Sequence, residues 1–71
     1  MGKIVLYLDH IMLEKKVSLT ELAEKVGITN ANLSKIKNNK VNAIRFSTLE
    51  SICEILECTP GDILKYEKPD E

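Results

Sequence analysis

The chain has 71 residues, and ten lysine and arginine residues against eleven aspartate and glutamate residues give it a net charge of −1. So short a chain forms one domain and has little room for an enclosed active-site cavity beside its core. The charge excludes a wholly basic nucleic-acid coat protein, and 44% apolar residues exclude intrinsic disorder. We expect one domain over residues 1–71, with its core in 8–65 and a tail at 66–71.

The longest apolar run extends only from Ile4 to Leu8. A membrane-spanning helix needs about 20 such residues, and the core of a signal peptide needs about 7–15. Cys53 and Cys58 are too few for a disulfide framework and lack the two-residue gap of a redox or zinc pair. We therefore expect a cytoplasmic protein with reduced thiols, no membrane association, no metal and no other cofactor.

The first predicted element is a short strand at residues 3–7, which are rich in β-forming residues and carry no helix cap. Residues 65–67 are its expected partner. The alternative is that residues 4–7 extend the helix that follows. Because a lone two-stranded ribbon is marginally stable in water, the strand interpretation includes completion of the ribbon by a second subunit.

The first predicted helix ends near Lys16 and starts either at Leu8 or after a cap at Asp9. Leu8, Ile11 and Met12 have the i, i+3, i+4 spacing of a buried helix face. We expect this face to pack in the core.

Capping signals mark the starts of four more helices. Ser18 and Ser47 each lie three residues before a glutamate, which is the spacing of a capping box. Thr59 precedes a proline at the first helical position, and Thr29 is a plain cap. The predicted helices are residues 19–26, 30–38, 48–57 and 60–65. Their predicted core residues are Leu22, Ala23, Val26, Leu33, Ile36, Leu49, Ile52, Cys53, Leu56, Ile63 and Leu64.

The second and third predicted helices have the spacing of a helix-turn-helix. Two helices that cross at about 90–120° through a short turn need a small residue where they approach, and Ala23 supplies one. Gly27 suits the turn, Ile28 fills the corner, and Leu33 and Ile36 anchor the second helix. The alternative is an ordinary helical hairpin that binds no DNA.

The charges are unevenly distributed. Residues 25–49 contain no acidic residue and five basic ones, Lys25, Lys35, Lys37, Lys40 and Arg45, so this stretch is +5 and the remainder is −6. A basic third helix with a basic loop after it indicates a surface that binds phosphates. A merely solvated lysine-rich face fits less well, because exposed helices usually mix both signs.

Residues 18–65, SLTELAEKVGITNANLSKIKNNKVNAIRFSTLESICEILECTPGDILK, resemble the phage-repressor and Cro family of helix-turn-helix transcriptional regulators, and above all its small bacterial members. The resemblance covers about two-thirds of the chain. It implies an all-α domain of five helices, here with the short N-terminal strand added. It also implies a dimer that reads double-stranded operator DNA through the major groove.

The resemblance places base-contacting side chains just inside the third helix, at Asn30, Ala31 and Lys35. Their chemistry agrees, because asparagine pairs with adenine, lysine favours guanine acceptors and an alanine methyl meets a thymine methyl. Arg45 is placed to reach a narrowed minor groove. The Phe46 ring is expected in the core, with its backbone amide on a phosphate. The other expected phosphate contacts are Ser18, Thr29, Asn32, Ser34, Lys37, Asn38 and Lys40.

The sequence departs from the family pattern at two places. Leu19 stands where a glutamine commonly braces a phosphate contact, so that contact is lost or replaced. Asn39 stands where the turn after the third helix usually has glycine. Asparagine is tolerated there because it enters the left-handed region more readily than other non-glycine residues.

We expect no enzyme. His10 has no cluster of ligands around it, Cys53 is expected on an apolar helix face, and the chain has no phosphate loop and no nucleophile–base arrangement. The predicted function is sequence-specific DNA binding by a homodimeric regulator, with repression as the default. Its interface is expected on the last two helices, the N-terminal segment, or both. The alternative is an antitoxin-like or adaptor interaction module on the same fold, against which the short tail at 67–71 argues.

Overall fold

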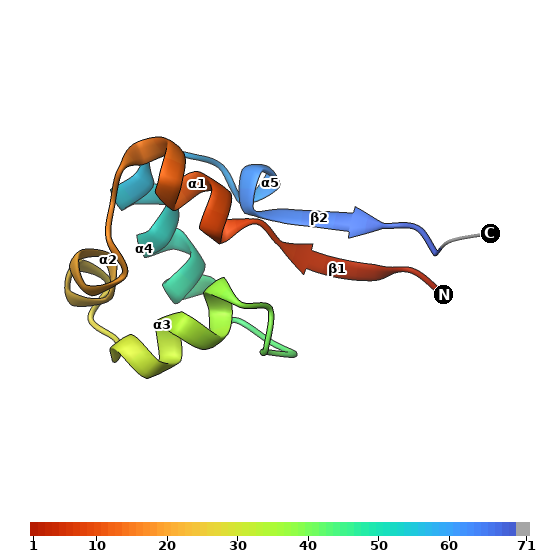
Figure 1. The fold of residues 1–71 in the computed structure, drawn as a ribbon, viewed down its shortest axis with the longest axis horizontal. Helices are drawn as coiled ribbons and strands as arrows, with labels where there is room; N and C mark the ends of the chain where they lie inside the picture. The colour runs from red at the N-terminus through yellow and green to blue at the C-terminus, as the bar shows by residue number, and fades with distance from the viewer. Residues whose placement is uncertain (70–71) are drawn as a thin grey trace.

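Helices form one end of the molecule, and a two-stranded ribbon extends from the other end (Figure 1). The computed structural model describes residues 1–69. The elements in chain order are β1 (Lys3–Leu6), α1 (Leu8–Lys15), α2 (Leu19–Val26), α3 (Asn30–Lys37), α4 (Phe46–Leu56), α5 (Pro60–Ile63) and β2 (Leu64–Glu67). The five-helix fold class with an N-terminal strand is therefore confirmed. Of the expected tail, residues 66 and 67 belong to β2, and residues 70 and 71 lie outside the described residues.

Three of the predicted helix starts are confirmed by their hydrogen bonds. The Ser18 hydroxyl accepts from the Glu21 amide at 3.1 Å, and the Thr29 hydroxyl accepts from the Asn32 amide at 3.1 Å. At the start of α5, the Thr59 amide donates to the Asp62 carboxylate at 2.9 Å. These bonds join residues three apart, so the sequence alone is enough to specify them.

The predicted cap of the fourth helix is wrong. Ser47 was expected to cap a helix from residue 48, but α4 begins at Phe46 after an extended Arg45. The Leu49 amide donates to the Arg45 carbonyl at 3.0 Å, so the first helical hydrogen bond forms two residues early. Ser47 lies inside the first turn, where its carbonyl accepts from the Ser51 hydroxyl at 3.1 Å. The buried face of the helix is unaffected, because Leu49, Ile52 and Leu56 set it.

The ribbon confirms the strand prediction and excludes the helical alternative for residues 4–7. β1 and β2 run antiparallel, with Ile4 opposite Tyr66 and Leu6 opposite Leu64. The Tyr7 amide donates to the Ile63 carbonyl at 2.7 Å and extends the ladder into the helical body. α5 is shorter than predicted because the chain enters β2 at Leu64.

The core lies between the ribbon base and the five helices, and α2 packs against both α3 and α4. Its buried residues are Leu6, Leu8, Met12, Leu22, Ala23, Leu33, Ile36, Leu49, Ile52, Leu56 and Ile63. The other predicted core residues, Ile11, Val26, Cys53 and Leu64, are partly buried at its margin. In residues 1–69, no helix has both the length and the apolar character needed to cross a membrane.

Candidate nucleic-acid interface

α2 and α3 form the predicted helix-turn-helix. Figure 1 shows α2 almost end-on while α3 runs across the view, so the two helices cross steeply. Gly27 ends α2 in the left-handed region at φ 87°, a conformation that an L side chain would strain, and its amide donates to the Ala23 carbonyl at 2.9 Å. Ala23 is 1% exposed and Leu33 is fully buried, so the small residue and the anchor lie where the spacing predicts.

The exposed side of α3 follows from its buried side. Leu33 and Ile36 face the core. At about 100° per residue, Ala31 points almost directly away from them, and Lys35 lies about 130° from their mean direction. Asn30 lies on the flank that faces α2, where its side-chain amide donates to the Thr20 hydroxyl at 3.3 Å. The three expected base-contacting residues are all exposed, and they occupy one continuous side of the helix.

The basic stretch divides into paired and unpaired cations. In α2, Lys25 pairs with Glu21 at 3.2 Å, and Lys37 of α3 reaches Asp9 of α1 at 3.6 Å. Within residues 1–69, the other three cations of the stretch form no ion pair, and they are Lys35, Lys40 and Arg45. The Lys25 pair has the i, i+4 spacing of neighbours on one helix. The spacing of charges along the chain could not show that Lys37 is paired, because its partner comes from a distant helix.

The polar residues expected on phosphates are held by local hydrogen bonds. Ser18 and Thr29 accept backbone amides, which leaves each hydroxyl hydrogen available to a further acceptor. The Asn38 side-chain amide donates to the Ser34 hydroxyl at 3.2 Å. Asn32 lies in the exposed first turn of α3. Hydroxyl and amide donors thus lie along the starts of both helices and the last turn of α3.

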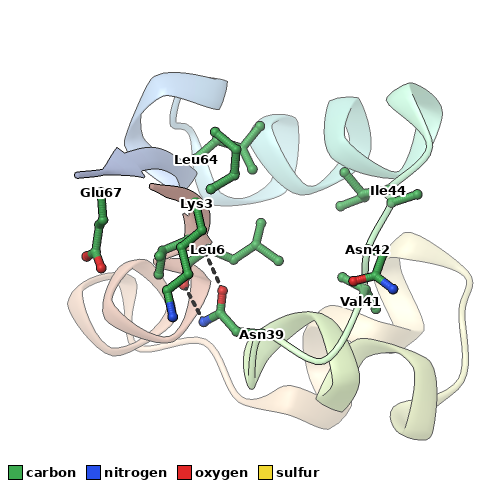
Figure 2. A pocket seen from close by; sticks show the side chains of 11 residues that line it. Lys3, Leu6, Asn39, Val41, Asn42, Ile44, Leu64 and Glu67 are labelled. Carbon is green, nitrogen blue, oxygen red and sulfur yellow. Dashed lines mark hydrogen bonds between the residues drawn. The ribbon is translucent and has the colours of Figure 1, made fainter. Parts of the chain in front are cut away.

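Asn39 is a residue of this region whose role the sequence did not reveal. Its backbone is left-handed, with φ 61°. Its side chain makes two hydrogen bonds to one residue of β1, accepting from the Leu6 amide at 2.6 Å and donating to the Leu6 carbonyl at 2.9 Å (Figure 2). The pair fixes the start of the loop that carries Lys40 and Arg45. The departure from the usual glycine is the one signal that pointed to Asn39, since glycine could turn there but could not bind Leu6.

The expected position of the Phe46 ring is wrong. The ring was predicted in the core, and the side chain is 80% exposed. Phe46 lies on the same stripe of α4 as Leu49 and Cys53, at i, i+3 and i+7. Phe46 is the first residue of that helix.

Within residues 1–69, no group of three or more histidine, cysteine, aspartate or glutamate side chains could hold a metal ion. His10 instead packs against Tyr7, with ring centroids 5.3 Å apart. Both cysteines are free. Burial and the adjacent Cys53 raise the pKa of Cys58 to about 11. A hydrogen bond from the Tyr7 hydroxyl to the Glu67 carboxylate raises the pKa of that tyrosine.

The steep crossing of α2 and α3, the exposed side of α3 and the unpaired cations beside it define a helix-turn-helix DNA-binding domain. The family model of the Cro/C1-type HTH DNA-binding domain matches residues 7–69, and the chain belongs to this family. The family resemblance of the sequence is therefore confirmed. Domains of this family are typically not enzymes.

A curated relative and a solved structure are among the proteins of this class to which the chain is similar. It is 54% identical over 68 residues to the uncharacterized HTH-type transcriptional regulator YozG of Bacillus subtilis (strain 168), a match that covers 96% of this chain and 81% of the relative. Its fold is similar to the crystal structure of the transcriptional regulator VanUg, with a TM-score of 0.74 and 25% identity. That match covers 96% of this chain and 89% of the other.

Proposed function

We propose that the chain is a homodimeric transcriptional regulator, by default a repressor, that reads a specific double-stranded DNA sequence by placing α3 in the major groove. The observation that carries this proposal is the side of α3 that faces away from the core. It presents Asn30, Ala31 and Lys35 to solvent, and the unpaired cations Lys40 and Arg45 follow in the adjoining loop. A dimer is part of the proposal because one domain reads one half-site and a two-fold pair reads two.

Base recognition is assigned to the exposed side of α3. Lys35 would donate to guanine acceptors, and the Ala31 methyl would meet a thymine methyl. The hydrogen bond from Asn30 to Thr20 uses one of the two N–H groups of the amide. The other N–H and the carbonyl oxygen are the donor and acceptor that adenine requires, so Thr20 would orient Asn30 for adenine without preventing that contact.

Phosphate binding is assigned to the residues around this side. Lys40 and the Phe46 backbone amide would bind phosphates, and Arg45 would bind a phosphate or enter the minor groove. Lys37 would contribute less than Lys40, because a contact with phosphate competes with its ion pair to Asp9. The remaining phosphate contacts are Ser18, Thr29, Asn32, Ser34 and Asn38.

Selection of bound sequences from a random DNA pool, followed by measurement of protein-to-DNA stoichiometry, tests the proposal. The expected result is a two-fold symmetric site that binds two chains. Binding of one chain to a site without symmetry would contradict the dimer. Recovery of no sequence preference would contradict specific recognition.

The alternative function is an interaction module on the same fold. The exposed side chains of Ile4, Phe46 and Tyr66 favour it, because large apolar groups on a surface mark contact sites. Absence of binding to any DNA in the selection experiment would support this alternative over the regulator.

A further inference from the structure

Two cysteines meet where α4 ends. Cys53 lies in the last turn of α4, and Cys58 is the second residue after the helix. Glu57, between them, has a left-handed backbone with φ 52°, and this conformation turns the chain back toward the helix. The Cys53 carbonyl consequently accepts two backbone amides, one from Glu57 and one, at 3.0 Å, from Cys58.

This turn places the two side chains beside each other. A bond from the second residue beyond a helix back to a carbonyl of its last turn defines a Schellman turn, in which the side chains of those two residues commonly pack together. Cys53 and Cys58 are both partly buried against the core, and both are free thiols. The Cys53 thiol is also near enough to help raise the pKa of Cys58. Two thiols therefore share one site at the margin of the core.

Cys53 is the member of the pair that a reagent can approach from solvent. It lines a hollow of about 500 Å³ together with Phe46 and Pro60, whereas Cys58 is not part of the lining of that hollow. Cys53 is thus placed to meet a small molecule, and Cys58 is placed to meet Cys53. Thiols that respond to oxidants commonly have this arrangement, an accessible cysteine next to a second one that resolves the first product.

We propose that Cys53 and Cys58 form a reversible intramolecular disulfide, which makes the end of α4 a redox-sensitive modification site. A disulfide requires Cα atoms about 4.4–6.8 Å apart and side chains that point toward each other. The bond lengths on either side of the 3.0 Å hydrogen bond limit the Cα separation to at most about 7 Å, and the bend at each atom shortens it into the required range. The Schellman turn supplies the direction of the side chains.

The reaction needs an oxidant, and a low-molecular-weight disulfide of the glutathione class supplies it. The Cys53 thiolate attacks one sulfur of the oxidant and displaces the other as a thiolate, which leaves a mixed disulfide on Cys53. The Cys58 sulfur then attacks the Cys53 Sγ, forms the internal bond and releases the second small thiolate. Two protein thiols are oxidised, one small disulfide is reduced, and the two thiol protons pass to the two released thiolates.

Two features of the site favour the disulfide over the free thiols. Strongly oxidising disulfides are those whose reduced form is stabilised, with the pKa of the attacking thiol lowered. Burial instead raises the pKa of Cys58 to about 11, so the reduced form gains no such stabilisation at Cys58. The two backbone bonds to the Cys53 carbonyl also close the turn before any disulfide forms, so the folded chain already holds the loop that the disulfide would span.

The cross-link lies away from the proposed DNA contacts. Cys53 follows Phe46 by seven residues of α4, which is about 10 Å along the helix axis. Neither cysteine belongs to α2 or α3. The inference therefore goes beyond the proposed function and does not depend on it, since the expected effect of oxidation is on stability.

Equilibration of the chain with glutathione redox buffers tests the proposal. Mass spectrometry reads the oxidised fraction from the loss of two hydrogen atoms, both in native buffer and in concentrated urea, and the glutathione composition converts this fraction to the effective concentration of the thiol pair. We expect this concentration to be about tenfold or more higher in the native chain than in the unfolded chain, because the folded turn holds the thiols together. An equal or lower value in the native chain would overturn the proposal.

Thermal unfolding measures the same coupling independently. A bond that the native structure favours about tenfold must favour the native structure by the same factor. In a domain of this size, that factor corresponds to a rise in Tm of about 5 °C or more in the oxidised chain. An oxidised chain whose Tm is unchanged or lower would contradict the proposed geometry.

Cys53→Ser and Cys58→Ser are the matched controls, because each leaves one thiol without its partner. Each variant is expected to form a mixed disulfide with glutathione and to show no rise in Tm after oxidation. A serine variant that gains the same rise in Tm as the wild type would overturn the proposal, because the rise would then need no internal bond. A wild type that yields only mixed disulfides, or only disulfides between chains, would overturn it as well.

Discussion

Replacing Asn39 tests the connection between the recognition unit and the ribbon. Asn39→Gly keeps the left-handed turn but removes the two hydrogen bonds to Leu6, which measure 2.6 and 2.9 Å. Asn39→Ala removes the same bonds and places an unsuited residue at φ 61°. Both variants should lower the free energy of unfolding, with alanine costing more than glycine.

The magnitude follows from the geometry. A hydrogen bond contributes about 0.5–1.5 kcal/mol net, and the lower part of the range applies because these two are only partly buried and water can replace the amide. The glycine variant regains a little by relieving the strain of the left-handed asparagine, which leaves a net loss of about 1 kcal/mol. The alanine variant adds about 1 kcal/mol of backbone strain, for a loss of about 2 kcal/mol.

Thermal and urea unfolding followed by circular dichroism measure these losses. In a domain of this size, 1 kcal/mol corresponds to about 4–8 °C in Tm, so Asn39→Gly should lower Tm by that amount and Asn39→Ala by about twice as much. Asn42→Ala, at an exposed position of the same loop, is the control and should change stability by less than about 0.5 kcal/mol. A glycine variant as stable as the wild type would show that the Leu6 hydrogen bonds contribute nothing.

Three further predictions concern DNA binding and titration. Lys35→Ala should relax the base preference at one position of each half-site, a contact worth about 1–3 kcal/mol. Lys40→Ala should weaken binding to all sequences and reduce the slope of log affinity against log salt concentration by about one. Equal loss of affinity for selected and random DNA in the Lys35 variant would make Lys35 a phosphate contact. The Thr59 amide and hydroxyl hold the pKa of Asp62 below 3.8, so the contribution of this carboxylate to stability is present above that pH and is lost as the pH falls through the lowered pKa. The free energy of unfolding of Asp62→Asn, measured in urea at several pH values, should lack this part of the acid dependence, and an unchanged acid profile would contradict the role of the cap. The pKa of Cys58, about 11, leaves little thiolate near neutral pH. Iodoacetamide should therefore label this residue far more slowly in the native chain than in the unfolded chain. Equal labelling rates would contradict the burial of Cys58.

Features that depend on neighbouring residues could be predicted from the sequence. The caps at Ser18, Thr29 and Thr59 form through bonds across three residues, so the signal and the structure it specifies lie within one turn. The spacing of Ala23, Gly27 and the apolar residues of α3 likewise predicted the helix-turn-helix, because helical periodicity decides which side chains face inward. The strand at the N-terminus followed from its β-forming residues and from the missing cap.

Features that depend on distant parts of the chain were decided by the tertiary structure. Lys37 looked like one more free cation until folding brought Asp9 within 3.6 Å. Asn39 binds Leu6 across 33 positions, a distance over which no local pattern carries information. Phe46 has the spacing of a core residue, but burial requires an opposing surface, and the folded chain leaves the Phe46 side chain 80% exposed although it buries Leu49 in the same turn. Local hydrogen bonds and periodicity therefore predicted which helices form, whereas contacts between elements decided which side chains on those helices remain free to bind.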